Sequence, residues 1–393
     1  MGARWKTFSP GIAAEQVARE EANAAVDRWW RAFADKKDDI AALFTEEQDW
    51  DLPAWIHEHL GAIDPNLMWE FGPGIDNGHR LVITPENRHD LRPLVDRMLA
   101  SAPAIDGWSF LDHRPREPFS MVEMTVEGRT GAPLAATGFK CEKGRFNFID
   151  IAVEFPKSLL RNNEDFAFSQ ALVLIESLLG EEDLDRWVGN IDVRAKGWRS
   201  SGIEGLPAAF DECRQSIIAE LPDGPFCQSV DDNEWTLFEL KPEQADDYPA
   251  QSDMYVGKSA SRELWENTHS GVRFDSVRYS RRGEVFCYVK TDGSEGLEGE
   301  RFQDKGDIED ALDEKLRAEG LGCFIGGGTG RRYSYVDLAL TDLSKGVEAI
   351  RQVLQEGQIT KRSWILFFDA DWATEWVGVW DDSPAPPMPD LDD

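Results

Sequence analysis

The chain has 393 residues, and its 74 acidic and 42 basic side chains give a formal net charge of −32. Hydrophobic residues make up 41% of the chain, which is enough to build packed cores and excludes wholesale disorder. A surface this acidic repels phosphate backbones and anionic lipids, which argues against nucleic-acid and membrane binding. A basic protein partner, bound cations and plain solubility remain as interpretations of the charge.

The five cysteines form no CxxC pair, and most of them lie in apolar, strand-like or helical stretches. Buried free thiols in a reducing compartment explain this pattern better than a disulfide framework. The N-terminus lacks the apolar stretch of a signal peptide, and no apolar run approaches the ~18 residues that a membrane span needs. We therefore expect a cytoplasmic protein, either a monomer or a homodimer.

Residues 1–65 are predicted to form a helical segment. Apolar residues there recur at the spacing of one helix face, at Val26, Trp29, Trp30 and Phe33. A second, shorter helix is expected over residues 52–60, with Asp51 as its N-cap and Pro53 in its first turn.

Residues 66–222 are predicted to form a first mixed domain, because strand-like runs alternate there with helical spacing. Strands are expected at residues 81–84, 107–111, 121–126, 135–141, 146–155 and 190–193. Helices are expected near residues 91–99, 166–179 and 206–221.

A polar stretch with Pro and Gly at residues 223–233 is predicted to be a linker to a second domain, residues 234–380. Within that domain we expect strands at 285–290, 321–325, 333–340 and 364–368, and helices at 308–319 and 346–355. The order β-α-β-β-α-β is that of the ferredoxin-like, or split βαβ, arrangement. The first domain fits the same order with extra strands inserted. We therefore predict an α+β protein of two tandem ferredoxin-like domains with antiparallel sheets.

The last segment, residues 381–393, is rich in Pro and Asp and has little to bury. Such a composition predicts a disordered acidic tail.

Two stretches of the chain repeat each other. Residues 144–153 and 330–340 both run from glycine and arginine through alternating aromatic residues to an aspartate, Asp150 in the first copy and Asp337 in the second. A Trp-Val-Gly tripeptide follows each, with Trp187 37 residues after Asp150 and Trp376 39 residues after Asp337. The repeat predicts duplicated architecture and does not by itself define a function.

Alternation along a strand sends neighbouring side chains to opposite faces. One face of each copy is then aliphatic and turned toward helices, and the other carries Phe146, Phe148 and Asp150, or Tyr333, Tyr335 and Asp337. In a ferredoxin-like domain both helices lie on one side of the sheet, so the aromatic face needs a cover. The other domain, another subunit or a ligand are the alternatives, and packing of the two halves on each other is the simplest.

The two repeated aspartates need hydrogen-bond donors if they are buried among aromatic rings. We expect each to accept from a Trp, a backbone N–H or an Arg of its own repeat, with Trp187 and Trp376 as first candidates. A catalytic or metal-binding role is the alternative to this structural one.

Other motifs favour structural interpretations. The glycine run at residues 326–330 leads from strand to strand, as a hairpin does, whereas a phosphate-binding loop leads into a helix. Arg331 and Arg332 beside it keep an anion-binding hypothesis open. His57 and His59 lie two residues apart, so on a helix they point away from each other and do not suggest a metal site.

The stretch from residue 326 to 340, together with residues 363–369 and 375–378, resembles bacterial protein families to which no activity is assigned. Residues 69–73, 102–103 and 107–108 give the same resemblance in the first half. The chain is also similar in fold class and acidity to the ribonuclease E activity regulator of the B type. That resemblance implies a ferredoxin-like core and a role in binding a protein.

These observations favour a non-catalytic, acidic protein-binding regulator or inhibitor, with a small-molecule binder or enzyme that uses an interdomain cleft as the alternative. We expect no cofactor and no metal. The candidate binding residues are those of the repeated strands and their neighbours: Phe146, Phe148, Asp150, Trp187, Arg331, Arg332, Tyr333, Tyr335, Asp337 and Trp376.

Overall fold

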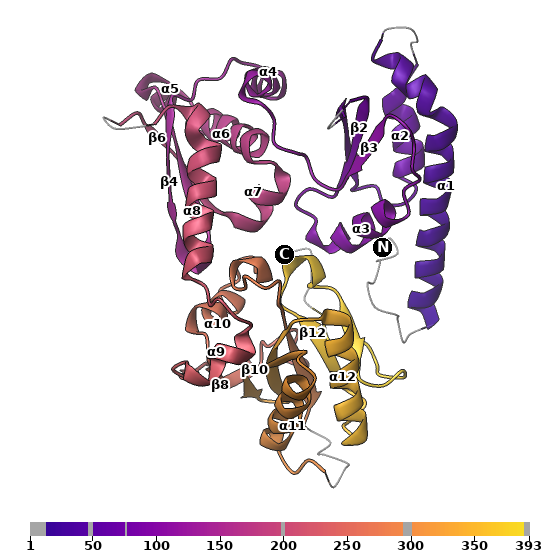
Figure 1. Cartoon of the computed structure of the whole chain (residues 1–393), viewed down its shortest axis with the longest axis vertical. Coiled ribbons are helices and arrows are strands. Elements are labelled where there is room, and N and C mark those ends of the chain that lie inside the picture. Colours follow the sequence, from indigo (N-terminus) through magenta and orange to yellow (C-terminus); the bar gives the residue numbers. More distant parts are fainter. Residues whose placement is uncertain (1–12, 46–49, 75–76, 198–200, 294–300, 389–393) are drawn as a thin grey trace. The chain divides into compact units, whose positions relative to one another are not determined.

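The computed structural model describes residues 13–45, 50–74, 77–197, 201–293 and 301–388 (Figure 1). Over these residues the chain is a mixed α+β protein with three separate sheets. It divides into two compact units, which are described one at a time. The N-terminal unit is Val26–Arg88 with Val95–Leu221, and the C-terminal unit is Pro222–Asp393 together with the short stretches Met1–Ala25 and His89–Leu94.

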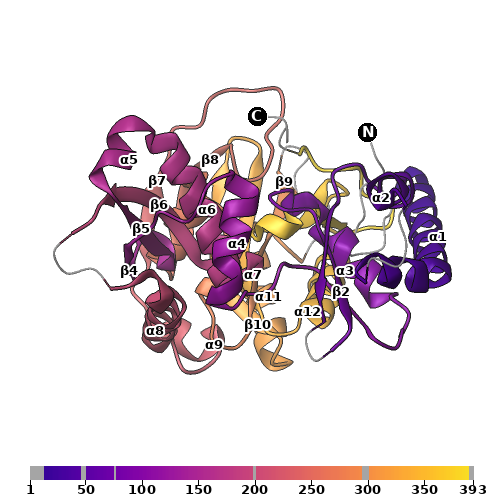
Figure 2. The same ribbon diagram turned by 90° about the horizontal axis from the view of Figure 1, so that it is seen from above.

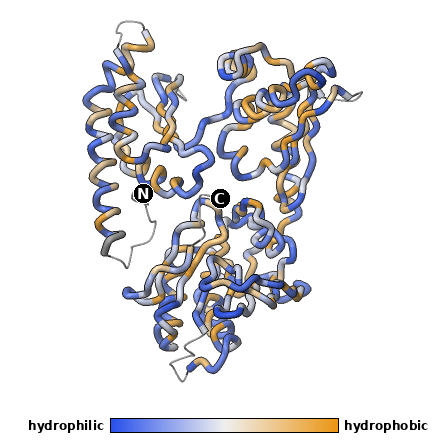
Figure 3. The backbone as a smooth tube through the Cα atoms, turned by 180° about the vertical axis from the view of Figure 1, so that it is seen from behind, coloured by the Kyte–Doolittle hydropathy of each residue, from blue (hydrophilic) through white to orange (hydrophobic). Residues whose placement is uncertain are grey.

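The first elements are helices α1, α2 and α3 and a three-stranded sheet in the order β1-β2-β3. Their bounds are α1 (Ala13–Leu43), α2 (Leu52–Leu60), β1 (Met68–Pro73), β2 (His79–Thr84), α3 (Arg92–Ala100) and β3 (Trp108–Leu111). Hydrophobic and hydrophilic residues alternate along α1 (Figure 3), and its predicted apolar face is buried. Phe33 on that face meets Trp108 of β3 edge to face, with ring centroids 5.0 Å apart.

The N-cap predicted for α2 is confirmed, because Asp51 accepts a hydrogen bond of 2.9 Å from the Ala54 backbone N–H.

A second three-stranded sheet has the order β4-β5-β6, with β4 antiparallel and β6 parallel to β5. Its elements are α4 (Phe119–Thr130), β4 (Gly138–Lys143), β5 (Ile149–Phe155), α5 (Lys157–Asn162), α6 (Glu164–Leu179), α7 (Glu181–Trp187), β6 (Val188–Ala195) and α8 (Leu206–Glu220). Helix α8 packs on β4 and α6 packs on β6 (Figure 2). The strands of residues 66–222 therefore form two sheets, and the single ferredoxin-like sheet expected there is not observed.

The strand expected at residues 121–126 is wrong, since these residues lie in α4. Val122 and Val126 are buried four residues apart, which is helical spacing, while Glu123 between them is exposed. Gly131 ends the helix in the left-handed conformation, with φ of 77°.

The C-terminal unit contains a seven-stranded sheet in the order β13-β12-β9-β11-β10-β8-β7. Its elements are α9 (Phe226–Ser229), β7 (Thr236–Glu239), β8 (Met254–Ser259), α10 (Arg262–Thr268), β9 (Val285–Asp292), α11 (Lys305–Ala318), β10 (Gly322–Gly330), β11 (Tyr333–Leu340), α12 (Leu343–Glu356), β12 (Ser363–Phe367) and β13 (Trp376–Gly378). From β9 to β12 the chain runs β-α-β-β-α-β with the spatial order β12-β9-β11-β10, all antiparallel. That is the order of a split βαβ unit, extended at both edges.

Short 3-10 helices complete the chain: His89–Leu91, Arg145–Asn147, Ile203–Gly205, Val230–Asp232, Ser276–Arg278 and Ala370–Trp372.

Helices α11 and α12 lie side by side (Figure 1) on one face of the seven-stranded sheet. The core between helices and sheet contains Val336, Leu338 and Leu340 of β11 with Leu312 of α11 and Ile350 of α12. This is the aliphatic face that alternation along the repeated strand predicts.

The opposite face of the sheet is covered by residues of the same unit. Tyr333 and Tyr335 are buried in a cluster with Tyr248, Met254 and Trp265, all of which belong to the stretch 240–280. The cover therefore comes from the segment between β7 and β9, and for these two tyrosines no packing of one domain on the other is needed.

The glycine run is part of strand β10, whereas the sequence suggested a hairpin connection. Its strand neighbours are β8 on one side and β11 on the other. A Cβ on Gly328 would lie 2.5 Å from the Met254 sulfur and from the Val256 carbonyl oxygen. A Cβ on Gly330 would lie 2.3 Å from the Asp253 carboxylate. The glycines are required because Asp253, Met254 and Val256 approach strand β10 closely.

We predict that Gly328→Ala lowers the free energy of unfolding by about 1–3 kcal/mol, the usual cost of overpacking, because a backbone carbonyl has to move. Gly128→Ala in α4 is the control, since nothing lies within 4 Å of its Cβ position. At this exposed helix position alanine is expected to stabilise by up to about 1 kcal/mol. Urea unfolding of both variants checks the pair, and equal stability of Gly328→Ala and wild type contradicts the packing argument.

The tail differs from the disorder expected for residues 381–393. The indole N–H of Trp364 donates to the Pro384 carbonyl oxygen at 2.6 Å, and Met388 packs against the aromatic cluster of the sheet. Arg351 pairs with Asp381 at 2.7 Å and Lys361 pairs with Asp382, so residues 381–388 are held by ion pairs, by the hydrogen bond to a buried tryptophan and by apolar contact. Residues 389–393 lie outside the described part of the chain.

Candidate functional site

The face of the C-terminal sheet opposite its helices combines aromatic and charged side chains. Cross-strand register places Asp292 beside Tyr333, Lys290 beside Tyr335, and Tyr288 beside Asp337. Side chains directly opposite each other on neighbouring strands share a face. We call these six residues the polar-aromatic face.

Residues 248–254, the covering segment, lie on this face and are held by Asp253. The Asp253 carboxylate accepts from the backbone N–H groups of Arg332, at 2.7 Å, and Tyr333, at 3.0 Å. It also accepts from the Tyr335 hydroxyl. Because Asp253 is fully buried, these donors supply the hydrogen bonds that a buried carboxylate needs.

Lys290 of strand β9 also binds the covering segment. Its ammonium donates to the carbonyl oxygens of Tyr248 and, at 3.0 Å, Ala250, and it lies 4.1 Å from the centroid of the Tyr333 ring. Burial lowers the pKa of Lys290 to about 7. The negative charges of Asp253 and Asp247 raise this pKa, but they offset the effect of burial only in part. The lysine is fully buried, so it acts as an internal anchor for the covering segment.

The predicted anion-binding arginines are engaged within the protein. Arg332 pairs with Asp292 at 2.7 Å, and Arg362 pairs with the same carboxylate at 2.8 Å. Arg331 donates to the Pro242 carbonyl oxygen at 3.1 Å. The structure thus provides carboxylate or carbonyl partners for these side chains without an added anion.

A cavity of about 470 Å³ lies beside the polar-aromatic face, at the end of the sheet where Tyr288 is found. Most of its lining is apolar or aromatic. The lining residues are Ala250, Gln251, Thr268, Gly271, Val272, Arg273, Phe274, Tyr288, Leu366, Phe367, Phe368, Ala370, Ala373, Pro387 and Met388. They come from the covering segment, from α10 and the loop after it, from β9 and β12, from the segment that follows β12, and from the tail.

Two polar groups at the cavity lack a partner within the described part of the chain. The Tyr288 hydroxyl makes no hydrogen bond there, and Gln251 uses only its amide N–H, which donates to Asp337 at 2.8 Å. The Tyr288 hydroxyl and the Gln251 amide oxygen can therefore serve a bound molecule.

Asp337 does not line the cavity, but it accepts a hydrogen bond from the lining residue Gln251. It is buried, and desolvation raises its pKa to about 7 although the Gln251 hydrogen bond acts to lower it. Its donor is thus an amide of the covering segment, whereas a Trp, a backbone N–H or an Arg of its own repeat was expected. Trp376 packs in the same aromatic cluster as Tyr335.

The first copy of the repeat is built differently. Phe146 and Asn147 have positive φ values of 58° and 57°, so the strand begins only at Ile149. The Asp150 carboxylate accepts from the Asn190 backbone N–H at 2.8 Å, one of the donor types expected for it. A Cβ on Gly144 or Gly189 would lie 2.6 Å from this carboxylate, so the site is closed around it.

The aromatic residues predicted beside Asp150 are buried. Phe146, Phe148 and Trp187 are each exposed by 5% or less. The predicted residues of the first copy thus lie in a packed interior. In the second copy none of the predicted residues lines the cavity, which is reached instead by Tyr288, the cross-strand neighbour of Asp337.

Sequence reasoning missed Tyr288, Lys290, Gln251 and Asp253. Lys290 had a signal, because a lysine inside an otherwise apolar strand needs buried acceptors. Gln251 and Asp253 lie in a loop-rich stretch with no periodicity, so their place on the sheet could not be seen.

Comparison of the chain with protein-family models, with curated proteins and with solved structures gave no match. Among the described residues, no group of three or more His, Cys, Asp or Glu side chains is placed to hold a metal ion. No helix of the described segments is long and apolar enough to cross a bilayer.

Proposed function

We propose that the C-terminal unit is a small-molecule-binding domain and that its ligand occupies the cavity beside Tyr288. The observation that carries this proposal is the aromatic cavity itself, with the Tyr288 hydroxyl and the Gln251 amide oxygen unpaired within the described chain. The residues that line this cavity all belong to the C-terminal unit, whereas the small-molecule site expected from the sequence was a cleft between two domains.

The size and lining of the cavity support this proposal. Small-molecule sites commonly measure about 300–1,000 Å³ and combine apolar walls with a few polar groups, and this cavity of about 470 Å³ fits both descriptions. Burial of aromatic surface supplies affinity, while an unpaired hydroxyl and amide oxygen supply orientation.

The proposal predicts that a bulky residue at the cavity rim abolishes binding. Ala373 is exposed and lines the cavity, so Ala373→Phe is expected to weaken ligands found in a fragment screen at least tenfold with little loss of stability. Ala318→Phe, at an exposed position at the end of α11, is the matched control and should bind as wild type does. Ligand-observed NMR and thermal unfolding measure the two effects.

Two outcomes would count against the proposal. One is a fragment screen without a ligand, and the other is ligands whose affinity Ala373→Phe leaves unchanged. The second outcome would place binding elsewhere on the chain.

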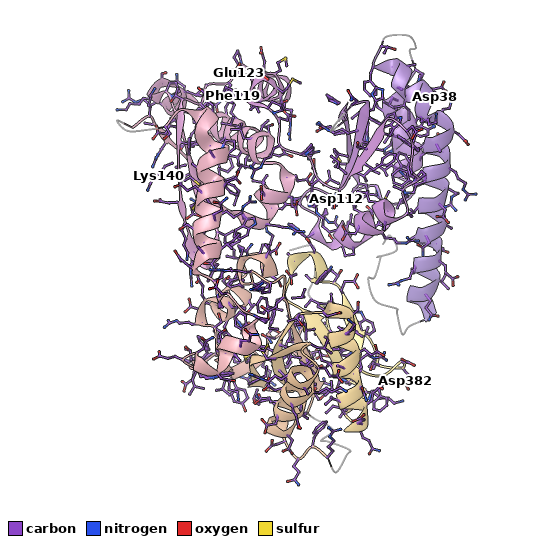
Figure 4. The ribbon with its side chains drawn as sticks, in the orientation of Figure 1. Asp38, Asp112, Phe119, Glu123, Lys140 and Asp382 are labelled. Carbon is purple, nitrogen blue, oxygen red and sulfur yellow. The ribbon has the colours of Figure 1, made fainter. Side chains whose placement is uncertain are left out.

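A second candidate function rests on the net charge of −32. We propose as this alternative an acidic cytoplasmic regulator that binds a basic protein, in keeping with the resemblance to the acidic ribonuclease E regulator of the B type. Asp38, Glu123 and Asp382 are exposed on three different parts of the chain (Figure 4), so the negative charge is distributed. A partner retained at low salt and released at high salt supports this function, while salt-independent retention contradicts it.

A further inference from the structure

Two of the five cysteines face each other in the N-terminal unit. Cys141 lies on β4 and Cys213 on α8, the helix that packs on this strand (Figure 2). Both thiols are free, and both side chains are only partly buried. The Cys141 thiol donates a hydrogen bond to the Cys213 sulfur, and this contact contributes to the pKa of each. The two sulfur atoms are therefore adjacent, although the residues are far apart in the sequence.

Contacts on either side of the cysteines fix the register of β4 against α8. Phe139, Cys141 and Lys143 share one face of β4, because side chains two residues apart on a strand point the same way. The Phe139 ring lies 3.7 Å from the Cβ position of Gly205, the residue that precedes α8. Near the other end of the helix, Lys143 pairs with Glu220 at 2.6 Å. The two cysteines lie between these two contacts.

Cys213 belongs to the stripe of α8 that faces the sheet. Leu206, Phe210 and Ile217 on this stripe are buried, and Cys213 falls among them at spacings of three and four residues. The position of Cys141 is set separately, by the antiparallel pairing of β4 with β5. Two elements that are each held by other contacts thus keep the sulfur atoms close, as disulfide formation requires.

We propose that Cys141 and Cys213 form a redox modification site, which a low-molecular-weight disulfide converts reversibly to a Cys141–Cys213 disulfide. The site lies in the N-terminal unit and does not depend on the cavity of the C-terminal unit.

The exchange takes place in two steps. The Cys213 thiolate attacks one sulfur of the small disulfide, so that a mixed disulfide forms and one thiolate of the small molecule leaves. Cys141 then loses its proton and attacks the Cys213 sulfur, which forms the protein disulfide and releases the second small thiolate. The two cysteines lose two electrons and two protons, and these convert the small disulfide to two thiols.

Cys213 attacks first because it is the acceptor in the thiol pair. Burial raises the pKa of both thiols, that of Cys141 to about 12. The hydrogen bond and the charges of Glu142 and Asp150 raise the pKa of Cys141 further. For Cys213 the same hydrogen bond and the charge of Lys143 act to lower the pKa. Cys213 therefore gives up its proton more readily than Cys141 does.

Both thiols remain protonated at neutral pH. Glu212 and Glu220 act with burial to raise the pKa of Cys213 above its ordinary value of 9.0, so its thiolate is a minor species. The rate of exchange is expected to rise about tenfold per pH unit between pH 7 and pH 9, as the thiolate fraction does. The pair therefore responds slowly to its redox surroundings, unlike an activated catalytic cysteine.

The test uses the full chain, which is reduced and then incubated with oxidised glutathione at pH 8.5. The intact mass is expected to fall by that of two hydrogen atoms, and a non-reducing peptide map should join the Cys141 peptide to the Cys213 peptide. Reduction with dithiothreitol should reverse both changes. Cys227→Ser, which removes another partly exposed thiol on α9, is the matched control and should form the disulfide as wild type does.

Single variants test the order of attack. Cys141→Ser should stop at a mixed disulfide with one glutathione on Cys213. Cys213→Ser should react at Cys141 at least tenfold more slowly than Cys141→Ser reacts at Cys213. Thermal unfolding checks that both variants are folded.

Three results would overturn the proposal. They are an unchanged mass of the wild-type chain, mixed disulfides without an intramolecular bond, and a peptide map that joins other cysteines, such as Cys227 and Cys323. If a variant fails to fold, the peptide map of the wild-type chain still decides, because it requires no substitution.

Discussion

Replacing Arg114 with methionine is expected to lower the free energy of unfolding by about 3–5 kcal/mol, the usual result of removing one partner from a buried ion pair. Arg114 lies between β3 and α4 in the N-terminal unit, and its side chain is 14% exposed. Methionine preserves much of the apolar stem, so the expected loss comes chiefly from the charge and its hydrogen bonds.

The size of the effect follows from the number of carboxylates that share this arginine. Its guanidinium donates to Glu86 at 2.7 Å, to Glu176 at 2.9 Å and to Glu70 at 3.2 Å. Glu181 lies 3.8 Å away and also accepts from the Arg114 backbone N–H. Without the arginine, like charges remain close together, and two of them, Glu176 and Glu181, are only 11% and 4% exposed.

Arg129→Met is the matched control for this prediction. Arg129 also pairs with Glu176, at 2.6 Å, but its side chain is 44% exposed, so a loss of at most about 1 kcal/mol is expected. Urea unfolding at neutral pH compares the two variants. If Arg114→Met loses no more than Arg129→Met, the four glutamates do not depend on Arg114.

The arrangement of the C-terminal sheet could be predicted from the sequence because its periodicity is clear. Alternation along residues 333–340 assigned Val336, Leu338 and Leu340 to one face and Tyr333 and Tyr335 to the other, as the two core clusters confirm. Because side chains along a strand alternate between the two faces, the face of each one can be assigned without knowing which strands lie beside it.

The first half could not be predicted in the same way, because strand pairing depends on partners distant in the sequence. In the C-terminal unit β9 lies between β11 and β12, whereas in the N-terminal unit β6 pairs with β5 directly. The repeated Trp-Val-Gly tripeptide also falls in different places, leading into β6 after a helix in one copy and forming β13 in the other. Similar local sequences therefore continue into different sheets.

The candidate site was predictable in part. The aromatic face and Asp337 were identified from the repeated strand, but the cavity depends on residues 248–254, on the loop after α10 and on the tail. Such irregular segments carry no period, and their contacts with the sheet are set by buried groups such as Asp253 and Lys290.

Replacing Asp337 with asparagine is expected to make the C-terminal unit less sensitive to pH. Burial raises the pKa of the Asp337 carboxyl in the folded state from 3.8 to about 7. Between these values the folded chain retains a proton that the unfolded chain releases. The contribution of this group to stability is therefore fully present below about pH 4 and is lost as pH rises to about 7.

Asparagine has no proton to release and still offers an amide oxygen to the Gln251 N–H, now 2.8 Å from the aspartate. The stability of Asp337→Asn minus that of wild type should therefore rise by about 3 kcal/mol between pH 5 and pH 8. Urea unfolding at several pH values, followed for the C-terminal transition, measures this difference.

The difference between variant and wild type isolates Asp337 from the other groups that titrate nearby. Asp369 has a pKa raised to about 7 and acts in the same direction, while Lys290, with a pKa lowered to about 7, adds stability as pH rises further. Both are present in the two proteins, so their contributions cancel in the difference. Asp381→Asn, at a side chain that is 98% exposed, should show no such trend. A difference that stays constant from pH 5 to pH 8 would mean that Asp337 is ionised in the folded protein across this range, and that buried donors beyond the Gln251 amide stabilise its charge.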